Sequence, residues 1–159
     1  MSIAQAPVEE CRKIMEFRHA RREDLPGILA LYVHLNPDDP TLPLDAAEAI
    51  WERIETDPSI AYFVACEEGQ ILSTCYVVVV PNLTRGGRSW AVVENMVTHP
   101  AHQGHGLGRA VLDLAVAFAR ERGCYKIALL SSARRVEAHR FYEAAGFDGD
   151  AKRGFYRAL

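Results

Sequence analysis

The chain has 159 residues and a net charge of −3, with 49% hydrophobic and 25% charged residues. A length of this order suits one domain, and no apolar run approaches the roughly 20 residues that a membrane-spanning helix needs. The acidic balance argues against a nucleic-acid-binding protein, because such proteins present a basic face. Neither a nucleic acid nor a membrane is therefore expected as a partner.

The first 14 residues show no hydrophobic periodicity, and they predict a flexible tail ahead of a single domain at 15–159. This tail carries Glu9 and Glu10 and lacks the apolar core of a signal peptide, so the expected location is the cytoplasm. No cysteine belongs to a C-x-x-C pair, and we interpret the cysteines as reduced, mostly buried thiols. The four are Cys11, Cys66, Cys75 and Cys124.

The first half of the chain reads as two helices framed by strands. Hydrophobic spacing predicts a short strand at 16–20, a helix that begins at Asp24 and, after a proline-rich loop, a helix at 45–55. Two apolar runs at 60–67 and 71–80 are separated by a glycine-containing turn, which is typical of a β-hairpin. The second run is apolar on both faces, so it is predicted to lie in the middle of a covered sheet.

The second half predicts a crossover from one strand to another. A strand at 89–98 precedes a glycine-rich turn, an apolar helix at 107–122 and a strand at 124–130, which should lie parallel to 89–98. A helix at 135–145 and a closing strand at 155–159 follow. The expected class is α/β of the α+β type, with a mixed, mostly antiparallel central sheet flanked by helices on both faces.

The glycine-rich turn contains Gly104, Gly106 and Gly108, directly before the long helix. Because glycine has no Cβ and permits positive φ, the backbone N–H groups of such a turn can point at a ligand. The helix N-terminus adds unpaired N–H groups, which suits a phosphate or pyrophosphate. Arg109 stands where a dinucleotide fingerprint needs its third glycine, and the Gly-Lys-Ser/Thr ending of a Walker loop is absent, so neither NAD nor ATP is favoured.

Two motifs resemble a known superfamily. Gln103-x-x-Gly106-x-Gly108 resembles the Q/R-x-x-G-x-G/A signature of the GNAT superfamily, the acyl-CoA-dependent N-acyltransferases. The F-Y-E-x-x-G-F segment at 141–147 is similar to one found near the C-terminus of these proteins. The two motifs occur in the family's order, and the resemblance spans about residues 15–159. It implies the GNAT fold, whose sheet splits between 89–98 and 124–130 to admit acetyl-CoA.

The resemblance implies that the turn binds the pyrophosphate of acetyl-CoA, and that the backbone of Met96 and Val97 meets the pantetheine and the thioester. The expected cofactor-binding residues are Met96, Val97, Gln103, Gly104, His105, Gly106, Leu107, Gly108 and Arg109. Arg135 stands where many members carry an asparagine that contacts the cofactor, so the contacts of Ser131, Ser132 and Arg135 are left open. No metal is expected, because the histidines near the turn lack the spacing of a metal motif.

The implied chemistry is attack of an amine on a thioester. An alkyl amine has a pKa of about 10.4, so a base is useful at neutral pH. Glu94, an ionisable residue in an apolar strand, is the candidate base; the alternative is a glutamate paired with an arginine or facing solvent. Tyr142 occupies the family's proton-donor position for the leaving thiolate; the alternative is a core tyrosine. Asn95 points to the face opposite Glu94 under simple alternation, and a β-bulge would reverse that assignment.

The predicted reaction is direct acetyl transfer to a primary amine in a ternary complex, because no cysteine has a recognisable nucleophile arrangement. The expected acceptor is a small molecule. Two alternatives stay open: a non-catalytic acyl-CoA-binding regulatory module, and an enzyme that acts on a protein lysine or N-terminal amine. By resemblance, specificity should lie in the loops at 35–41 and 81–88, with Leu35, Asn36 and Asp38 as candidates. A homodimer is also open, with an available edge at 155–159.

Overall fold

The computed structural model describes residues 14–159. Almost all of the predicted tail, and Cys11 with it, lies outside the described residues. The fold is built on a five-stranded sheet with the order β1-β2-β3-β4-β5. Three neighbouring pairs are antiparallel and only β4–β5 is parallel, which confirms the predicted mixed, mostly antiparallel sheet.

The elements follow the predicted order. The strands are β1 (Met15–His19), β2 (Ile60–Glu67), β3 (Gln70–Val80), β4 (Trp90–Thr98) and β5 (Ile127–Leu129). The α-helices are α1 (Leu25–Leu35), α2 (Leu44–Glu55), α3 (Leu107–Glu121) and α4 (Val136–Ala144). Short 3-10 helices occupy Arg22–Asp24, Arg85–Gly87 and Pro100–His102.

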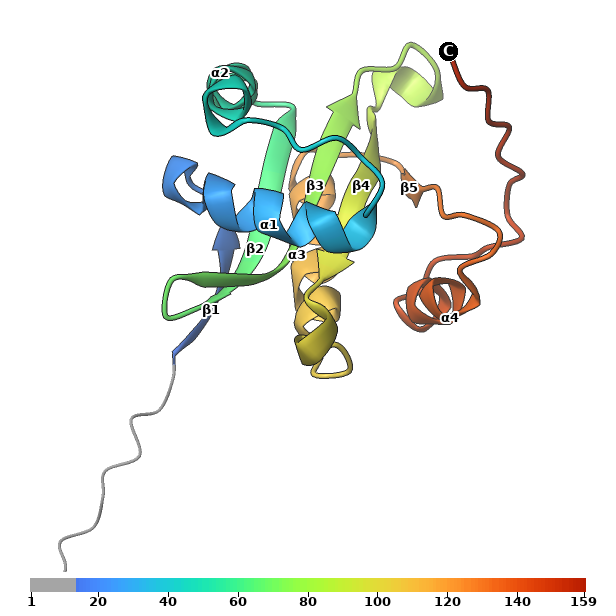
Figure 1. The fold of residues 1–159 in the computed structure, drawn as a ribbon. Coiled ribbons are helices and arrows are strands. Elements are labelled where there is room, and N and C mark those ends of the chain that lie inside the picture. The colour runs from blue at the N-terminus through green and yellow to red at the C-terminus, as the bar shows by residue number, and fades with distance from the viewer. Residues whose placement is uncertain (1–13) are drawn as a thin grey trace, which may run out of the picture.

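Helices cover both faces of the sheet (Figure 1). One face packs against α1 and α2 in a core cluster that includes Ile28, Leu31 and Trp51. The other face packs against α3 in a larger cluster, which α4 joins at its edge. The strand β3 lies in the middle of the sheet, and both faces of its first half are buried, as its continuous apolar run predicts.

The C-terminal segment differs from the prediction. The expected strand at 155–159 is wrong: the segment has no regular structure, and the side chains of Phe155 and Tyr156 are 90% and 88% exposed. The strand expected at 124–130 shortens to the three residues of β5. Both segments have the apolar composition of a strand. A segment becomes a strand only where a partner strand satisfies its backbone N–H and C=O groups. The dimer edge expected at 155–159 is therefore absent, and the sheet ends at β5.

Two β-bulges shift the register of the hairpin strands. In the β2–β3 pair, Cys66 pairs with Ile71 but Ala65 pairs with Ser73, so Leu72 is an extra residue on β3. In the β3–β4 pair, Thr74 pairs with Val97 and Tyr76 pairs with Glu94. Cys75 of β3 therefore lies opposite two residues of β4, Asn95 and Met96, which defines a second bulge.

The described cysteines are free. Cys66 and Cys75 are buried and Cys124 is half-buried, in agreement with their interpretation as reduced thiols. Burial raises the pKa of the Cys75 thiol to about 12, so it stays protonated at neutral pH. In the part of the chain that the structure describes, no helix is long and apolar enough to cross a membrane.

A buried ion pair fixes the entry into α1. The Asp24 carboxylate is 5% exposed and accepts two hydrogen bonds from the Arg18 guanidinium, at 2.6 and 3.0 Å. It also accepts the backbone N–H of Arg21 at 2.7 Å. Burial by itself raises the pKa of Asp24, but the bonds from Arg18 and Arg21 more than offset it, so the pKa lies below its usual value. β1 and α1 are joined through this carboxylate.

We expect Asp24→Ala to lower the free energy of unfolding by about 3 kcal/mol, because it leaves the Arg18 charge partly buried without its partner. Glu16→Ala is the matched control: Glu16 bonds the same guanidinium from an exposed position, and its loss should cost less than about 0.5 kcal/mol. Because the folded-state pKa of Asp24 is lowered, its contribution is present above pH of about 4 and is lost as pH falls through the folded pKa. Urea unfolding of both variants measures this, and equal losses at pH 7 would contradict it.

Candidate active site

A row of polar side chains crosses three strands on the face covered by α1 and α2. Tyr62 of β2 pairs with Tyr76 of β3, and Tyr76 pairs with Glu94 of β4. The rings of Tyr62 and Tyr76 stack, with centroids 4.9 Å apart and planes 14° apart. Residues opposite one another in a sheet share a face, so Glu94 lies at one end of an aromatic row.

Asn95 forms the bulge next to this row. Its φ of 51° lies in the left-handed region, which asparagine tolerates better than most residues. The bulge puts Asn95 beside the buried hydroxyl of Tyr32 on α1, on the face that carries Glu94. Simple alternation predicts that Asn95 points to the face opposite Glu94. Because of the bulge, both side chains lie on the same face.

The structure brings Glu94 near Tyr142, which α4 supplies. Burial raises the pKa of Glu94 above its usual value. Burial also raises the pKa of Tyr142, with the charge of Arg135 acting against the rise and that of Glu94 adding to it. The charge of Glu94 thus adds to the raised pKa of Tyr142. Tyr142 also packs at the edge of the α3-side core, which supports the alternative of a core tyrosine, and its role as proton donor stays a prediction.

The pairing of β4 with β5 ends immediately before Glu94. Its last pair is Val93 with Leu129, and β4 then continues to Thr98 while the chain beyond β5 turns away toward α4 (Figure 1). This agrees with a sheet that splits between these two strands. Beyond the bulge, Val97 joins the α1-side core and Met96 packs on the α3 side, so these two side chains leave on opposite faces.

The turn before α3 presents uncapped backbone donors. Gly106, the N-cap residue, has a φ of 81° and no side chain caps the helix. The first helical hydrogen bond runs from the N–H of Ala110 to the carbonyl of Gly106, at 3.0 Å. The N–H groups of Leu107, Gly108 and Arg109 therefore lack partners within the helix.

Space and conformation at this turn fit an anionic group. Gly104 has a φ of 79°, and a Cβ built at Gly104 or Gly106 meets no other atom within 4 Å. A pyrophosphate can approach the backbone here, where the helix dipole also favours negative charge. The residues present thus fit the phosphate groups of an acyl-CoA.

Gly108 has a different role from the other two glycines. It lies inside α3, without positive φ, and a Cβ there would come within 3.0 Å of Thr98 Oγ1 and 3.2 Å of Met96 Cε. Gly108 therefore permits α3 to pack closely on β4, and its backbone N–H stays a predicted cofactor contact.

Gln103 of the signature and Arg109, which directly follows the signature, make contacts within the protein. The Gln103 amide donates to the carbonyl of Thr98 at 3.2 Å and so fixes the start of the turn to the end of β4. The Arg109 guanidinium binds Asp113 at 2.9 Å and donates to the carbonyl of Ala144 at 2.8 Å. Arg109 thus connects the first turn of α3 to the last turn of α4, the helix that carries Tyr142.

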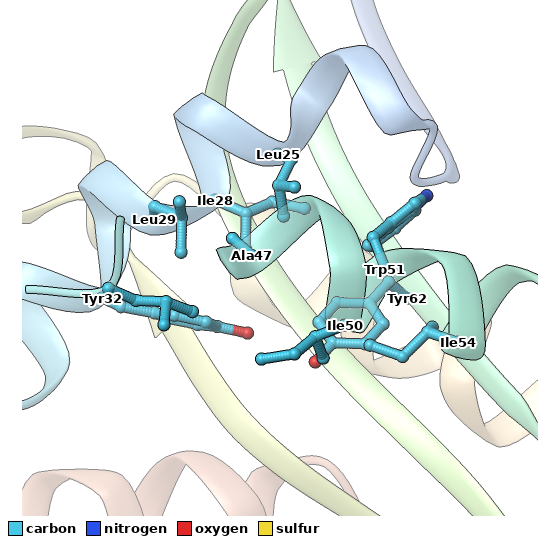
Figure 2. Close-up of a pocket in the computed structure, with 10 residues that line it drawn as sticks. Leu25, Ile28, Leu29, Tyr32, Ala47, Ile50, Trp51, Ile54 and Tyr62 are labelled. Atoms are coloured by element: carbon cyan, nitrogen blue, oxygen red, sulfur yellow. The ribbon is translucent and has the colours of Figure 1, made fainter. Parts of the chain in front are cut away.

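An apolar cavity lies between α1, α2 and β2, on the same face as Glu94 (Figure 2). Its aromatic lining comes from Tyr32, Trp51 and Tyr62, none of which the sequence alone singled out. The loop candidates Leu35, Asn36 and Asp38 do not line it, whereas Leu42 does. Predicting that Tyr62 and Tyr76 lie side by side requires the strand register, which cannot be derived from the sequence alone.

Histidine rings near the turn lie against one another. The ring of His99 lies 5.0 Å from that of His34 and 5.5 Å from that of His102. Its Nδ1 accepts the backbone N–H of Ala101 at 3.2 Å. Among residues 14–159, no three His, Cys, Asp or Glu side chains are grouped so that they could hold a metal ion.

Comparison with known proteins identifies the family of the chain. Residues 17–147 match the model of the acetyltransferase (GNAT) family. The glucosamine 6-phosphate N-acetyltransferase of Trypanosoma brucei brucei is 31% identical over 84% of this chain and 88% of its own. An aminoglycoside N(6')-acetyltransferase type 1 of Stenotrophomonas maltophilia is 31% identical over 71% of this chain and 77% of its own. A solved structure from Agrobacterium tumefaciens is 40% identical, with a TM-score of 0.85 over 91% of this chain and 99% of that one.

The chain belongs to the GNAT acetyltransferase family. It is accordingly an acyl-CoA-dependent N-acetyltransferase, a class whose named relatives acetylate small-molecule amines.

The left-handed backbone conformation of Asn95 in the bulge leads to a testable prediction about the free energy of unfolding. Asn95→Val should lower the free energy of unfolding by about 1–2 kcal/mol relative to Asn95→Gly, because a β-branched residue is disfavoured at positive φ whereas glycine is not. Both variants remove the amide, so the comparison isolates the backbone. Urea denaturation measures the difference, and equal stabilities of the two variants would exclude a left-handed residue at this position.

Proposed function

We propose that this enzyme transfers an acetyl group from acetyl-CoA to the primary amine of a small molecule, by direct attack in a ternary complex. The observation that carries the proposal is the placement of Glu94 and Tyr142. They come from β4 and α4, the charge of Glu94 contributes to the raised pKa of Tyr142, and Glu94 directly follows the last β4–β5 pair. The names of relatives that acetylate glucosamine 6-phosphate and aminoglycosides support a small acceptor.

The turn from Gln103 to Arg109 would hold the cofactor through its backbone. The free N–H groups at the start of α3 would bind the pyrophosphate, and the backbone at Met96 and Val97 would meet the pantetheine and thioester beside the bulge. Acetyl-CoA supplies the activated acetyl group. A donor near the carbonyl oxygen stabilises the negative charge that develops there during attack.

Glu94 would accept the proton that the attacking amine loses, directly or through a water molecule. Its pKa is raised by burial, which brings a carboxylate closer to the pH at which it is an effective base. In its ionised form Glu94 carries a negative charge. The same charge attracts an ammonium group of the acceptor.

Tyr142 would donate a proton to the departing thiolate of CoA. Its raised pKa keeps the hydroxyl protonated at neutral pH, so it can act as a donor. Arg109, which holds the carbonyl of Ala144 at the end of α4, would help to fix the position of this tyrosine.

The proposed cofactor-binding turn can be tested by introducing a negative charge at Gly104. Acetyl-CoA should raise the melting temperature of the native protein, since a ligand stabilises by RT ln(1 + [L]/Kd). Gly104→Asp should remove most of this rise, because it puts a carboxylate beside the pyrophosphate. Gly104→Asn is the matched control, with similar size and the same tolerance of positive φ, and it should retain the rise. No rise for the native protein at millimolar acetyl-CoA would contradict the cofactor assignment.

The two candidate proton-transfer groups are tested by pH profiles of kcat/KM, measured as CoA thiol release with a reactive amine. A base must be deprotonated, so activity should rise with pH through the pKa of Glu94, which burial raises above its usual value. Glu94→Gln should remove this limb and lower kcat about 100-fold. Tyr142→Phe should lower kcat by a similar factor while the acidic limb stays.

If both variants keep native rates with the true acceptor, the assignment of these roles is wrong. Acetyl-CoA binding without thiol release from any amine would favour the regulatory-module alternative. Release only with lysine-containing peptides or N-terminal amines would favour a protein acceptor.

A further inference from the structure

Glu94 is a half-buried carboxylate without a cationic partner in the part of the chain that the structure describes. No arginine or lysine among residues 14–159 forms an ion pair with it, and burial alone accounts for its raised pKa. A carboxylate that is partly removed from water is costly unless it is paired. The arrangement therefore favours a cation that a ligand supplies.

Tyr76 of β3 faces Glu94 from the neighbouring strand. The two residues are directly paired, and paired residues of antiparallel strands have Cβ atoms about 5 Å apart on the same face of the sheet. On its other side, the ring of Tyr76 stacks on that of Tyr62, with centroids 4.9 Å apart. This separation is close to the spacing of neighbouring strands, about 4.8 Å, so the rings stack along the direction from β2 to β3. The second face of the Tyr76 ring therefore turns toward β4 and Glu94.

The charge of Glu94 acts on this ring. Burial raises the pKa of Tyr76, and the charge of Glu94 raises it further. The cation–π contacts of the described residues are on other rings, those of Trp90, Phe118 and Tyr125. The face of an aromatic ring is the negative end of its quadrupole, so a carboxylate opposite that face is unfavourable by itself. A cation between the ring and the carboxylate would be attracted by both.

We propose that Tyr76 binds the acceptor amine in its ammonium form by a cation–π contact, while the ammonium group donates a hydrogen bond to Glu94. An alkyl amine, with a pKa of about 10.4, is protonated at neutral pH. An ammonium that bonds the carboxylate at about 2.8 Å lies within the roughly 6 Å over which a ring attracts a cation. This inference rests on the proposed acetyl transfer and names a substrate-binding residue of that same site.

Proton transfer ends this contact. When an N–H bond of the ammonium breaks and the proton passes to the Glu94 carboxylate, the nitrogen keeps the electron pair and the neutral amine is no longer held by the ring. The amine is then free to attack the thioester. Tyr76 thus stabilises the bound ammonium and not the later species, so weakening its ring should raise KM for the amine more than it lowers kcat.

A series of substitutions at Tyr76 tests the ring. Tyr76→Phe keeps the aromatic face, whereas fluorinated phenylalanines at the same position weaken its negative potential with little change in size. With ethylamine as the acceptor and CoA thiol release as the assay, Tyr76→Phe should leave KM for the amine within about twofold of native. Trifluorophenylalanine should raise that KM about fivefold, fewer fluorines should give intermediate values, and kcat should change by less than about twofold.

The matched control introduces trifluorophenylalanine in place of Tyr125. The ring of Tyr125 already carries Arg85 and Lys126, each 5.7 Å from its centroid. This substitution should leave KM for ethylamine unchanged, because the cations on that ring belong to the protein and not to the acceptor. Circular dichroism and the acetyl-CoA melting shift check that every variant is folded and binds the cofactor.

Binding without turnover separates this role from the proposed reaction. The dissociation constant of ethylamine is measured by calorimetry in the presence of CoA, which carries no acetyl group, and it should rise about fivefold with trifluorophenylalanine in place of Tyr76. An unchanged constant along the series, or an equal rise with the substitution of Tyr125, would overturn the role of Tyr76 while acetyl transfer stands. A graded rise without thiol release from any amine would keep the ammonium contact and remove the proposed acetyl transfer.

Discussion

The register of β2, β3 and β4 is the constraint on which the site depends. Two extra residues set it: Leu72 in the second half of the hairpin and one residue of the Asn95–Met96 pair. Without the first bulge, the turn at Glu67–Gln70 would pair Tyr62 with Cys75. A one-residue slip moves every following side chain to the other face. The aromatic row ending at Glu94 therefore exists only because both bulges are present.

The bulge in β4 also explains why this strand can serve both faces of the sheet. Below it, the strand carries Glu94 toward α1 and α2; beyond it, Met96 packs against Gly108 and α3. Close packing at Gly108 places the uncapped start of α3 beside the end of β4, and Gln103 ties the intervening turn to Thr98. The uncapped backbone donors before α3 and the ionisable Glu94 are thus both positioned by β4.

Local signals made much of this predictable. The glycine turn, the helix after it and the parallel crossover follow from residue types at fixed spacings, and the structure contains all three. Glu94 stood out as an ionisable residue in an apolar strand, and its environment does raise its pKa. The packing role of Gly108 was not predicted, because a glycine gives the same signal whether it is required for positive φ or for close packing.

Other parts had no local signal. Tyr32, Trp51 and Tyr62 read as ordinary apolar positions, and only the packing of α1 and α2 on the sheet brings them around one cavity. The bulge at Leu72 lacks a glycine or proline that would mark it. The segment 155–159 has the composition of a strand. Whether it finds a partner strand depends on the tertiary structure, and the described fold provides none.

The cavity lies on the side of the sheet covered by α1 and α2, whereas the glycine-rich turn opens α3, which covers the other side. Changes in well-separated groups have nearly additive energetic effects. Mutational drift in α1 and α2 can therefore reshape the cavity while the start of α3 keeps its geometry. The fold is in this sense modular. Substitutions in β4, which contacts both regions, would affect the cavity side and the α3 side together.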